Sequence, residues 1–425
     1  MLTQMTVPLL GLADTAVLGH LDSPRYLAAV AIGANLFTVL FWTFGFMRMG
    51  TTGLAAQAYG RQQPHQLAAL LVRSLVISLV LGLGLVALQQ PLIATGLRFM
   101  QPDPGVAALA AEYAAIRIWS APAVLVQYTL IGWLIGTQYP RGPLLILVLA
   151  NSLNILLDVL FVTIFGWHSR GVALATVIAE YSGCALALWL VWHRLPESLP
   201  TRQVLLGVWA DYRAILDVNR FILVRTLLLL FTFAFFTAQG ARAGETIVAA
   251  NAVLLTFLLI ISNGLDGFAH AAEALVGEAK GRRDRNALLR VCRVTLKWSL
   301  WGAGLFTLAF MAGGQGLIQL LTSIEPVRST AIQFLPWVWL MPLIAVWGYA
   351  FDGIFIGAMR TRAMQNTMLV SVLLVFLPVW WLTQSWGNQG LWFAFMTFLA
   401  TRGLLMGGLF WRWQRKNSLL TGHGF

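Results

Sequence analysis

Apolar residues follow one another in long runs along the whole chain, and short polar, glycine- or proline-containing segments separate the runs. A helix needs about 20 mostly apolar residues to cross a bilayer, and twelve runs approach or exceed that length. Their centres lie near residues 11, 42, 80, 127, 154, 182, 228, 259, 304, 344, 374 and 400. The pattern predicts an all-α integral membrane protein with twelve transmembrane helices.

The composition excludes an ordinary soluble domain. Of the 425 residues, 59% are hydrophobic and 10% are charged, whereas soluble domains average about 45–50% and about 25%. The net charge of +12 could indicate nucleic-acid binding, but 18 of the lysines and arginines fall in the loops of one side and five in those of the other. The positive-inside rule explains this asymmetry without a nucleic acid partner and predicts that both termini are cytoplasmic.

The two halves of the chain resemble each other. The matched positions are 57–61 with 278–282, and Gly132, Gly136 and Arg141 with Gly353, Gly357 and Arg362, all at an offset of 221, and Gly171 with Gly390 at 219. An offset of six helices preserves membrane orientation, so we expect two six-helix lobes related by a pseudo-two-fold axis along the membrane normal. Chance matching of glycine- and alanine-rich helices is the alternative.

This repeat sets the expected domain organisation. Residues 1–195 are predicted to form the N-terminal lobe and residues 216–414 the C-terminal lobe. Residues 196–215 are polar and proline-containing, which is typical of a cytoplasmic linker, and residues 415–425 are predicted to be a cytoplasmic tail.

Ionisable side chains inside membrane spans are costly and therefore indicate function. In the N-terminal half Asp14 lies midway along the first predicted helix, Asn154 and Asp158 share one helix face, and Thr176 and Glu180 share another. Burial favours the uncharged form of a carboxylate, as a reversible proton or sodium site requires. The alternative is that these groups only cross-link helices through hydrogen bonds.

A second polar cluster is predicted in the C-terminal half. Asp266, His270 and Glu273 follow one helix face at i, i+4 and i+7. Asp352 and Arg225 lie in neighbouring predicted helices and could complete a network. Because Arg225 can pair with either aspartate, an interior salt bridge and a transport site remain equally open.

Four further arginines lie near predicted spans: Arg48, Arg73, Arg117 and Arg402. Long cationic side chains usually extend to the membrane interface or pack against carbonyl groups. We expect these four to do the same.

The run Val7–Gly19, with Asp14, and the segment Leu153–Asp158 resemble multidrug and toxic compound extrusion (MATE) transporters over the whole chain. The segments Leu265–Ala269 and Phe351–Gly353 resemble the bacterial DNA-damage-inducible (DinF) branch of that family. The resemblance implies two six-helix lobes, cation-coupled export, and alternation between outward-open and inward-open states.

The resemblance also implies roles for single residues. Asp14 matches the family's carboxylate on helix 1, Asn154 and Asp158 match its pair on helix 5, and Thr176 matches a hydroxyl of the same pocket. Glu180 lies where relatives often have an apolar residue, and the helix 7 acid of other branches is not matched.

The beginning of the chain carries two more expectations. Members of the family that the chain resembles usually start about twenty residues earlier, so a truncated or mis-assigned start at Met1 is expected. Pro8 removes a backbone hydrogen bond in the first helix, which predicts a hinge through which protonation could bend that helix.

The predicted function is an antiporter that exports cationic or amphiphilic small molecules, with H⁺ as the expected coupling ion and Na⁺ as the alternative. We expect a monomer in the bacterial inner membrane, with the lipid bilayer and the exported compound as its partners and with no cofactor or metal. The physiological substrate stays open.

Three other functions are alternatives to the antiporter. A flippase for a lipid-linked oligosaccharide would share the fold but would favour basic residues in its cavity, for which Arg225 and Arg48 are candidates. An integral-membrane enzyme would need a catalytic set, and the sequence has no His-Glu-x-x-His, Gly-x-Ser-x-Gly or phosphate-loop motif. A passive channel would conduct without a gradient of a second ion.

Overall fold

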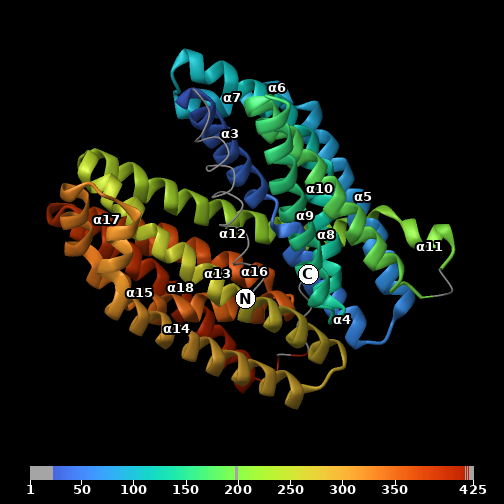
Figure 1. Cartoon of the computed structure of the whole chain (residues 1–425). Coiled ribbons are helices and arrows are strands. Elements are labelled where there is room, and N and C mark those ends of the chain that lie inside the picture. Colours follow the sequence, from blue (N-terminus) through green and yellow to red (C-terminus); the bar gives the residue numbers. More distant parts are fainter. Residues whose placement is uncertain (1–22, 197–199, 417, 419, 421–425) are drawn as a thin grey trace. The chain divides into compact units, whose positions relative to one another are not determined.

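The computed structural model describes residues 23–196, 200–416, 418 and 420. Within these residues the chain is helical and contains no strand. Eleven helical segments are long and apolar enough to cross a membrane. They coincide with eleven of the twelve predicted spans, and the first predicted span, centred near residue 11, lies outside the described residues. The expected all-α membrane fold is confirmed (Figure 1).

The chain divides into two compact units. The N-terminal unit extends to Ile215 and the C-terminal unit begins at Leu216. This division falls at the end of the segment predicted to be a linker, and helix α12 (Trp209–Arg242) carries the chain from one unit into the next.

From residue 23 onward, the N-terminal unit contains five long membrane-spanning segments and shorter connecting helices. In chain order its elements are α3 (Pro24–Thr43), α4 (Phe46–Gly60), α5 (Pro64–Ala87), α6 (Gln89–Met100), α7 (Pro104–Arg117), the 3₁₀ turn η1 (Ile118–Ser120), α8 (Ala121–Gly136), α9 (Arg141–Asp158), the π-helix η2 (Val159–Ile164), α10 (His168–Trp192) and α11 (Arg202–Leu206). Helices α3 and α4 form one span with a break between them, and so do α7, η1 and α8.

The C-terminal unit has longer and less interrupted helices. After α12 they are α13 (Glu245–Gly281), α14 (Arg285–Leu321), α15 (Glu325–Gly357), α16 (Thr361–Leu369), the π-helix η3 (Val370–Phe376), α17 (Leu377–Leu382), the 3₁₀ turn η4 (Gln384–Trp386) and α18 (Asn388–Arg415). Helix α15 packs against α13, α14 and α18 and is the central helix of this unit (Figure 1).

Local sequence signals explain several helix boundaries. Proline occupies the first turn of α3, α5 and α7, where its missing N–H breaks no intrahelical hydrogen bond. Asp284 caps α14 by accepting a hydrogen bond from the backbone N–H of Ala287 at 2.9 Å.

Two glycines bring α8 into backbone contact with α4 in the N-terminal unit. A Cβ atom on Gly132 would collide with the carbonyl oxygen of Arg48, and one on Gly136 would collide with that of Thr52. Only glycine allows the two helices to approach this closely.

The C-terminal unit repeats this contact between α15 and α13. A Cβ atom on Gly353 would collide with the carbonyl oxygen of Ala269, and one on Gly357 would collide with that of Glu273. All four residues stand 221 positions after their counterparts in the N-terminal unit. The repeat therefore extends from sequence to the interhelical contacts of each unit.

A buried hydrogen-bonded group stabilises the core of the C-terminal unit. Asn251 on α13 and Asn388 on α18 exchange amide hydrogen bonds at 2.8 and 3.0 Å, and the indole N–H of Trp392 donates to the same Asn251 oxygen at 2.9 Å. Around this group lies an aromatic core that includes Phe236 and Phe395. The two helices are thus joined by polar contacts within an apolar interior.

Candidate functional site

Three predicted site residues of the N-terminal unit meet between α9 and α10. Asn154, Asp158 and Thr176 are exposed by 2%, 0% and 9%, respectively. The Asn154 amide nitrogen donates to Asp158 Oδ2 at 3.0 Å, and the amide oxygen accepts from the Thr176 backbone N–H at 3.2 Å. The amide therefore bridges the carboxyl group and the neighbouring helix.

The Asn154 amide presents its nitrogen to the carboxyl group of Asp158. An ionised carboxylate only accepts hydrogen bonds and fits this donor. The Thr176 hydroxyl lies 3.1 Å from the Asn154 oxygen and 2.8 Å from the carbonyl oxygen of Val172, and it can donate to either. The site thus provides a hydrogen-bond donor for the ionised form of Asp158.

The helix changes its hydrogen-bonding pattern directly after Asp158. Residues Val159–Ile164 form a π-helix, in which backbone groups pair at i, i+5 and the turn is wider than in an α-helix. Such segments are frequent at functional sites. The apolar periodicity of the sequence carried no signal for this wide turn.

Glu180 lies one turn beyond Thr176 and forms an ion pair. Its Oε1 atom is 3.6 Å from the guanidinium of Arg117, which is 8% exposed. The Arg117 guanidinium also lies over the rings of Phe37 and Phe41, with its Cζ atom 5.6 and 5.4 Å from their centroids. The expectation that Arg117 extends to the interface or packs against carbonyls is wrong for its guanidinium, because an acid and two aromatic rings hold it inside.

Two predicted residues of this site fall on the first helix. Asp14 and Pro8 lie outside the described residues. Their roles as helix 1 carboxylate and hinge stay predictions.

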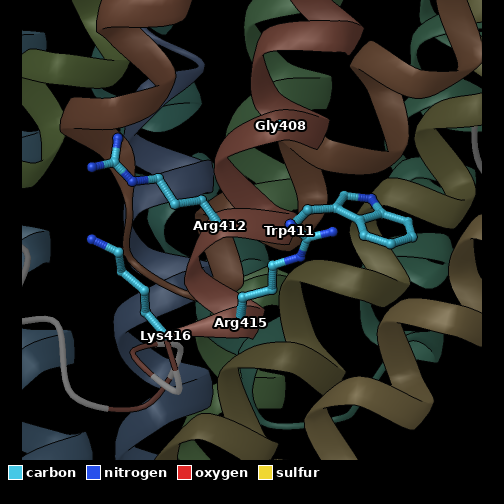
Figure 2. A pocket seen from close by; sticks show the side chains of 5 residues that line it. All are labelled: Gly408, Trp411, Arg412, Arg415 and Lys416. Atoms are coloured by element: carbon cyan, nitrogen blue, oxygen red, sulfur yellow. The ribbon is translucent and has the colours of Figure 1, made fainter.

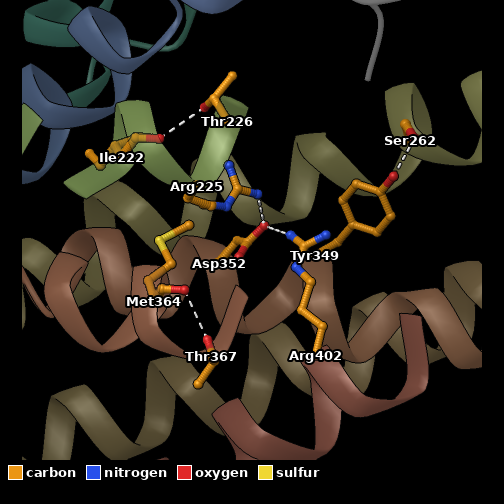
Figure 3. Close-up of polar contacts among 9 residues, drawn as sticks. All are labelled: Ile222, Arg225, Thr226, Ser262, Tyr349, Asp352, Met364, Thr367 and Arg402. Atoms are coloured by element: carbon orange, nitrogen blue, oxygen red, sulfur yellow. Dashed lines mark hydrogen bonds and ion pairs between the residues drawn. The ribbon is translucent and has the colours of Figure 1, made fainter. Parts of the chain in front are cut away.

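In the C-terminal unit, two arginines converge on one carboxylate. Arg225 of α12 and Arg402 of α18 both pair with Oδ2 of Asp352 on α15, as Figure 3 shows. The three side chains are exposed by only 6%, 3% and 6%, respectively. Of the two pairings that the sequence left open for Arg225, the structure shows the one with Asp352.

The remaining polar groups surround this centre. The Arg402 guanidinium lies 5.8 Å from the ring centroid of Tyr349, whose hydroxyl bonds to Ser262 (Figure 3). Asp266 lies close enough to Arg402 and Tyr349 to act on both electrostatically. The two arginines and the two aspartates are therefore nearly balanced in charge.

The other two members of the predicted C-terminal cluster continue along α13. His270 is half-buried, and Glu273 is 2% exposed beside the tight contact with Gly357. The helix therefore places the three residues at successive turns, as their spacing predicted.

Arg402 was not recognised from the sequence as a member of this centre. We expected it at the interface or against carbonyls, and that expectation is wrong, since it is buried against Asp352. Its depth was the signal that could have found it: residue 402 is halfway along the 28-residue helix α18. Arg73 does pack against carbonyls, donating to those of Val204 and Leu205 at 2.8 and 3.3 Å.

The described residues offer no metal centre. Among them, no group of three or more histidine, cysteine, aspartate or glutamate side chains is arranged to hold a metal ion.

Comparison with known proteins agrees with this architecture. The family model MatE matches the chain twice, over residues 1–160 and 222–382, so each half carries one copy at the spacing of the internal repeat. DNA damage-inducible protein F of Escherichia coli (strain K12) is 43% identical over 417 residues, which cover 98% of this chain and 90% of that protein. The probable multidrug resistance protein NorM of Acinetobacter baylyi is 25% identical and is covered to 92%, with 96% of this chain aligned.

A solved structure supports the fold. A MOP superfamily transporter from Pyrococcus furiosus superimposes with a TM-score of 0.88 at 20% identity, covering 99% of this chain and 94% of that one. The resemblance to the MATE family and to its DinF branch, which the sequence predicted, is confirmed by these matches.

Proposed function

The chain belongs to the MatE family of transporters, and from this premise we propose that it is a proton-coupled antiporter that exports cationic or amphiphilic small molecules. It acts as a multi-pass protein of the bacterial inner membrane with both termini in the cytoplasm. The 18-to-5 distribution of basic residues between its two sets of loops supports this orientation.

One observation carries the proposal: Asp158 is fully buried in a membrane-spanning helix, where the Asn154 amide donates a hydrogen bond to its carboxylate. An ionisable group is kept inside a membrane at a high energetic cost, so its presence there supports an exchange function. Asp14, which the family resemblance sets in the same pocket, is proposed to act with Asp158.

Coupling follows from competition for the charge of these acids. A proton neutralises Asp158, whereas a cationic substrate is attracted only while the carboxylate is ionised. A ligand shifts a conformational equilibrium only by its differential affinity for the two states. We therefore assign proton and substrate to mutually exclusive occupancy of one site that opens to each side of the membrane in turn.

Glu180 has a different role in this proposal. Its Oε1 atom lies 3.6 Å from the guanidinium of Arg117. This contact joins α10 to the end of α7. We assign Glu180 to holding α10 against Arg117, beside the exchanging group.

The test is dye transport in inverted membrane vesicles under an imposed pH gradient. With an acidic lumen the wild type accumulates a cationic dye, and Asp158→Asn lowers the initial rate at least about 100-fold because the amide cannot ionise. Asp103→Asn is the matched control, since Asp103 is exposed at the N-terminus of α7 and keeps full transport. Full pH-driven accumulation by correctly inserted Asp158→Asn protein would disprove the proposal.

The same vesicles distinguish the coupling ion. Accumulation that needs an outward-directed sodium gradient, with Na⁺ loaded into the vesicle lumen, and that persists without a pH gradient, would replace the proton by Na⁺. Asp14→Asn is expected to abolish proton-driven transport as well.

The flippase alternative is less well supported. An anionic, lipid-linked substrate needs basic groups with charge to spare, and Arg225 and Arg402 both pair with Asp352. Translocation of a fluorescent lipid-linked oligosaccharide by the purified protein, in the absence of an ion gradient, would favour that alternative.

A further inference from the structure

The end of α18 carries an open surface pocket. Its volume is about 340 Å³, and its lining residues are Gly408, Trp411, Arg412, Arg415 and Lys416 (Figure 2). The first four stand at i, i+3, i+4 and i+7, so a single face of the helix builds the pocket. Figure 2 shows the side chains of Arg412 and Lys416 extending to the same side of the helix.

The pocket concentrates positive charge. Arg412, Arg415 and Lys416 are exposed, and among the described residues none of them forms a salt bridge. By contrast, Arg282 at the end of α13 pairs with Glu278. The helix C-terminus attracts cations, but that effect is worth only about 0.3–1 kcal/mol per group. The helix C-terminus therefore does not neutralise the three cations, and an external anion could pair with them.

An apolar track leads into the same pocket. Leu404, one turn before Gly408, is 75% exposed and Trp411 is 62% exposed. Gly408 is the notch between them: a Cβ atom there would meet nothing within 4 Å. The surface of α18 is thus apolar towards the middle of the helix and positively charged at its end.

The end of α18 is also held in place. The Arg360 guanidinium lies 4.7 Å from the ring centroid of Trp413 and donates to the carbonyl of Ser418 at 2.6 Å. Arg285 at the start of α14 donates to the carbonyl of Gln414 at 3.4 Å. These contacts fix the helix end from its other faces, so the pocket has preorganised walls.

We infer that this pocket binds an anionic phospholipid of the cytoplasmic leaflet. The phosphate group binds Arg412 and Lys416, which extend to the same side of the helix, and Arg415 adds positive charge from beside Trp411. An acyl chain lies over Gly408 and Leu404. The chemistry of the occupant follows from the two parts of this surface. A soluble phosphate would leave the apolar part uncovered, and a neutral lipid would leave the three cations without an anion. Tryptophan at the boundary fits the headgroup level of a bilayer.

The experiment measures lipid binding to the full-length protein in detergent by native mass spectrometry. Phosphatidylglycerol and phosphatidylethanolamine are titrated separately. The wild type is expected to bind phosphatidylglycerol about tenfold more tightly than phosphatidylethanolamine. The triple variant Arg412→Gln, Arg415→Gln, Lys416→Gln is expected to lose this preference.

Matched controls separate the pocket from general surface charge. The triple variant Arg61→Gln, Arg141→Gln, Arg362→Gln removes equally exposed cations at other helix ends and is expected to keep the preference. Gly408→Leu fills the notch without a charge change and is expected to weaken phosphatidylglycerol binding severalfold. Gly304→Leu, also in open space on α14, is its control.

Two outcomes would overturn the inference. One is equal loss of preference in both triple variants, which would mean diffuse attraction to the basic face. The other is that inorganic phosphate alone competes away the bound lipid at micromolar concentration, which would indicate a site for a free anion. If the charge variant does not fold, unchanged binding by Gly408→Leu would overturn it as well.

Discussion

The two units share a scaffold but reverse the sizes of two facing side chains. In the N-terminal unit Gln127 of α8 faces Gly183 of α10, where an added Cβ would lie 3.1 Å from the amide oxygen. The equivalent residues of the C-terminal unit are Gly348 of α15, 221 positions after Gln127, and Arg402 of α18, 219 positions after Gly183. Here a Cβ atom added at Gly348 would lie 3.4 Å from the Nε atom of Arg402. Each pair keeps one large and one small partner, so the glycine leaves room for the long side chain opposite it, including that of the buried Arg402.

The polar sites themselves have diverged completely. At the repeat offset, Asp158 corresponds to Val379, and Thr176 corresponds to Phe395. Conversely, Asp352 corresponds to Ile131. Asp158, Thr176 and Asp352 therefore stand at positions that are apolar in the other unit. Under the proposed function the centre with Asp158 exchanges ions, whereas the centre with Asp352, which is internally paired, stabilises its unit.

The largest expected effect on stability comes from removing the carboxylate charge of Asp352, and the same change at Asp158 is the comparison. Asp352→Asn leaves Arg225 and Arg402 without their shared anion, and breaking a buried ion pair costs about 3–5 kcal/mol. Asp158→Asn is expected to change stability by less than about 1 kcal/mol, since a neutral amide still bonds to Asn154. Thermal unfolding in detergent measures both.

The opposite order of the two variants in stability would break the comparison. It would show that the N-terminal centre is structural. A rescue design sharpens the test: adding Arg402→Met to Asp352→Asn removes one surplus cation and is expected to recover part of the loss.

A smaller effect, equal in both units, is expected at the shared glycine contacts. Gly132→Leu and Gly353→Leu force apart helices that touch through their backbones, at a cost of about 3 kcal/mol each. Gly304→Leu, in open space, is the control. Unfolding temperatures and expression yields measure the effect, and a large difference between the two units would contradict a common scaffold.

The smallest effect concerns a surface ion pair of the C-terminal unit. Arg282 is 57% exposed and pairs with Glu278 one turn earlier on α13. Exposed pairs contribute about 0–1 kcal/mol, so Arg282→Gln is expected to lower stability by less than that. A loss of stability comparable with that of Asp352→Asn, measured by the same thermal unfolding, would show that burial does not determine how much an ion pair contributes to stability.

The sequence predicted the helices well because a bilayer requires long apolar runs, and all eleven spans in the described part of the chain were located. It also placed Asn154 and Asp158 on one face, since helical spacing alone determines that. It failed for Arg117 and Arg402, because a cation in an apolar run is compatible with both an interface and a buried partner. Only the partner helix decides between them, and pairing between distant helices leaves no local pattern.

The glycine contacts have a consequence for ion leakage. Where α8 meets α4 and α15 meets α13, no space remains for a methyl group, and a water molecule is about as large. A chain of hydrogen-bonded waters cannot pass between the helices at these glycines, so the contacts offer no path for protons or hydrated ions there. Under the proposed proton coupling, this close packing prevents loss of the gradient at these two places.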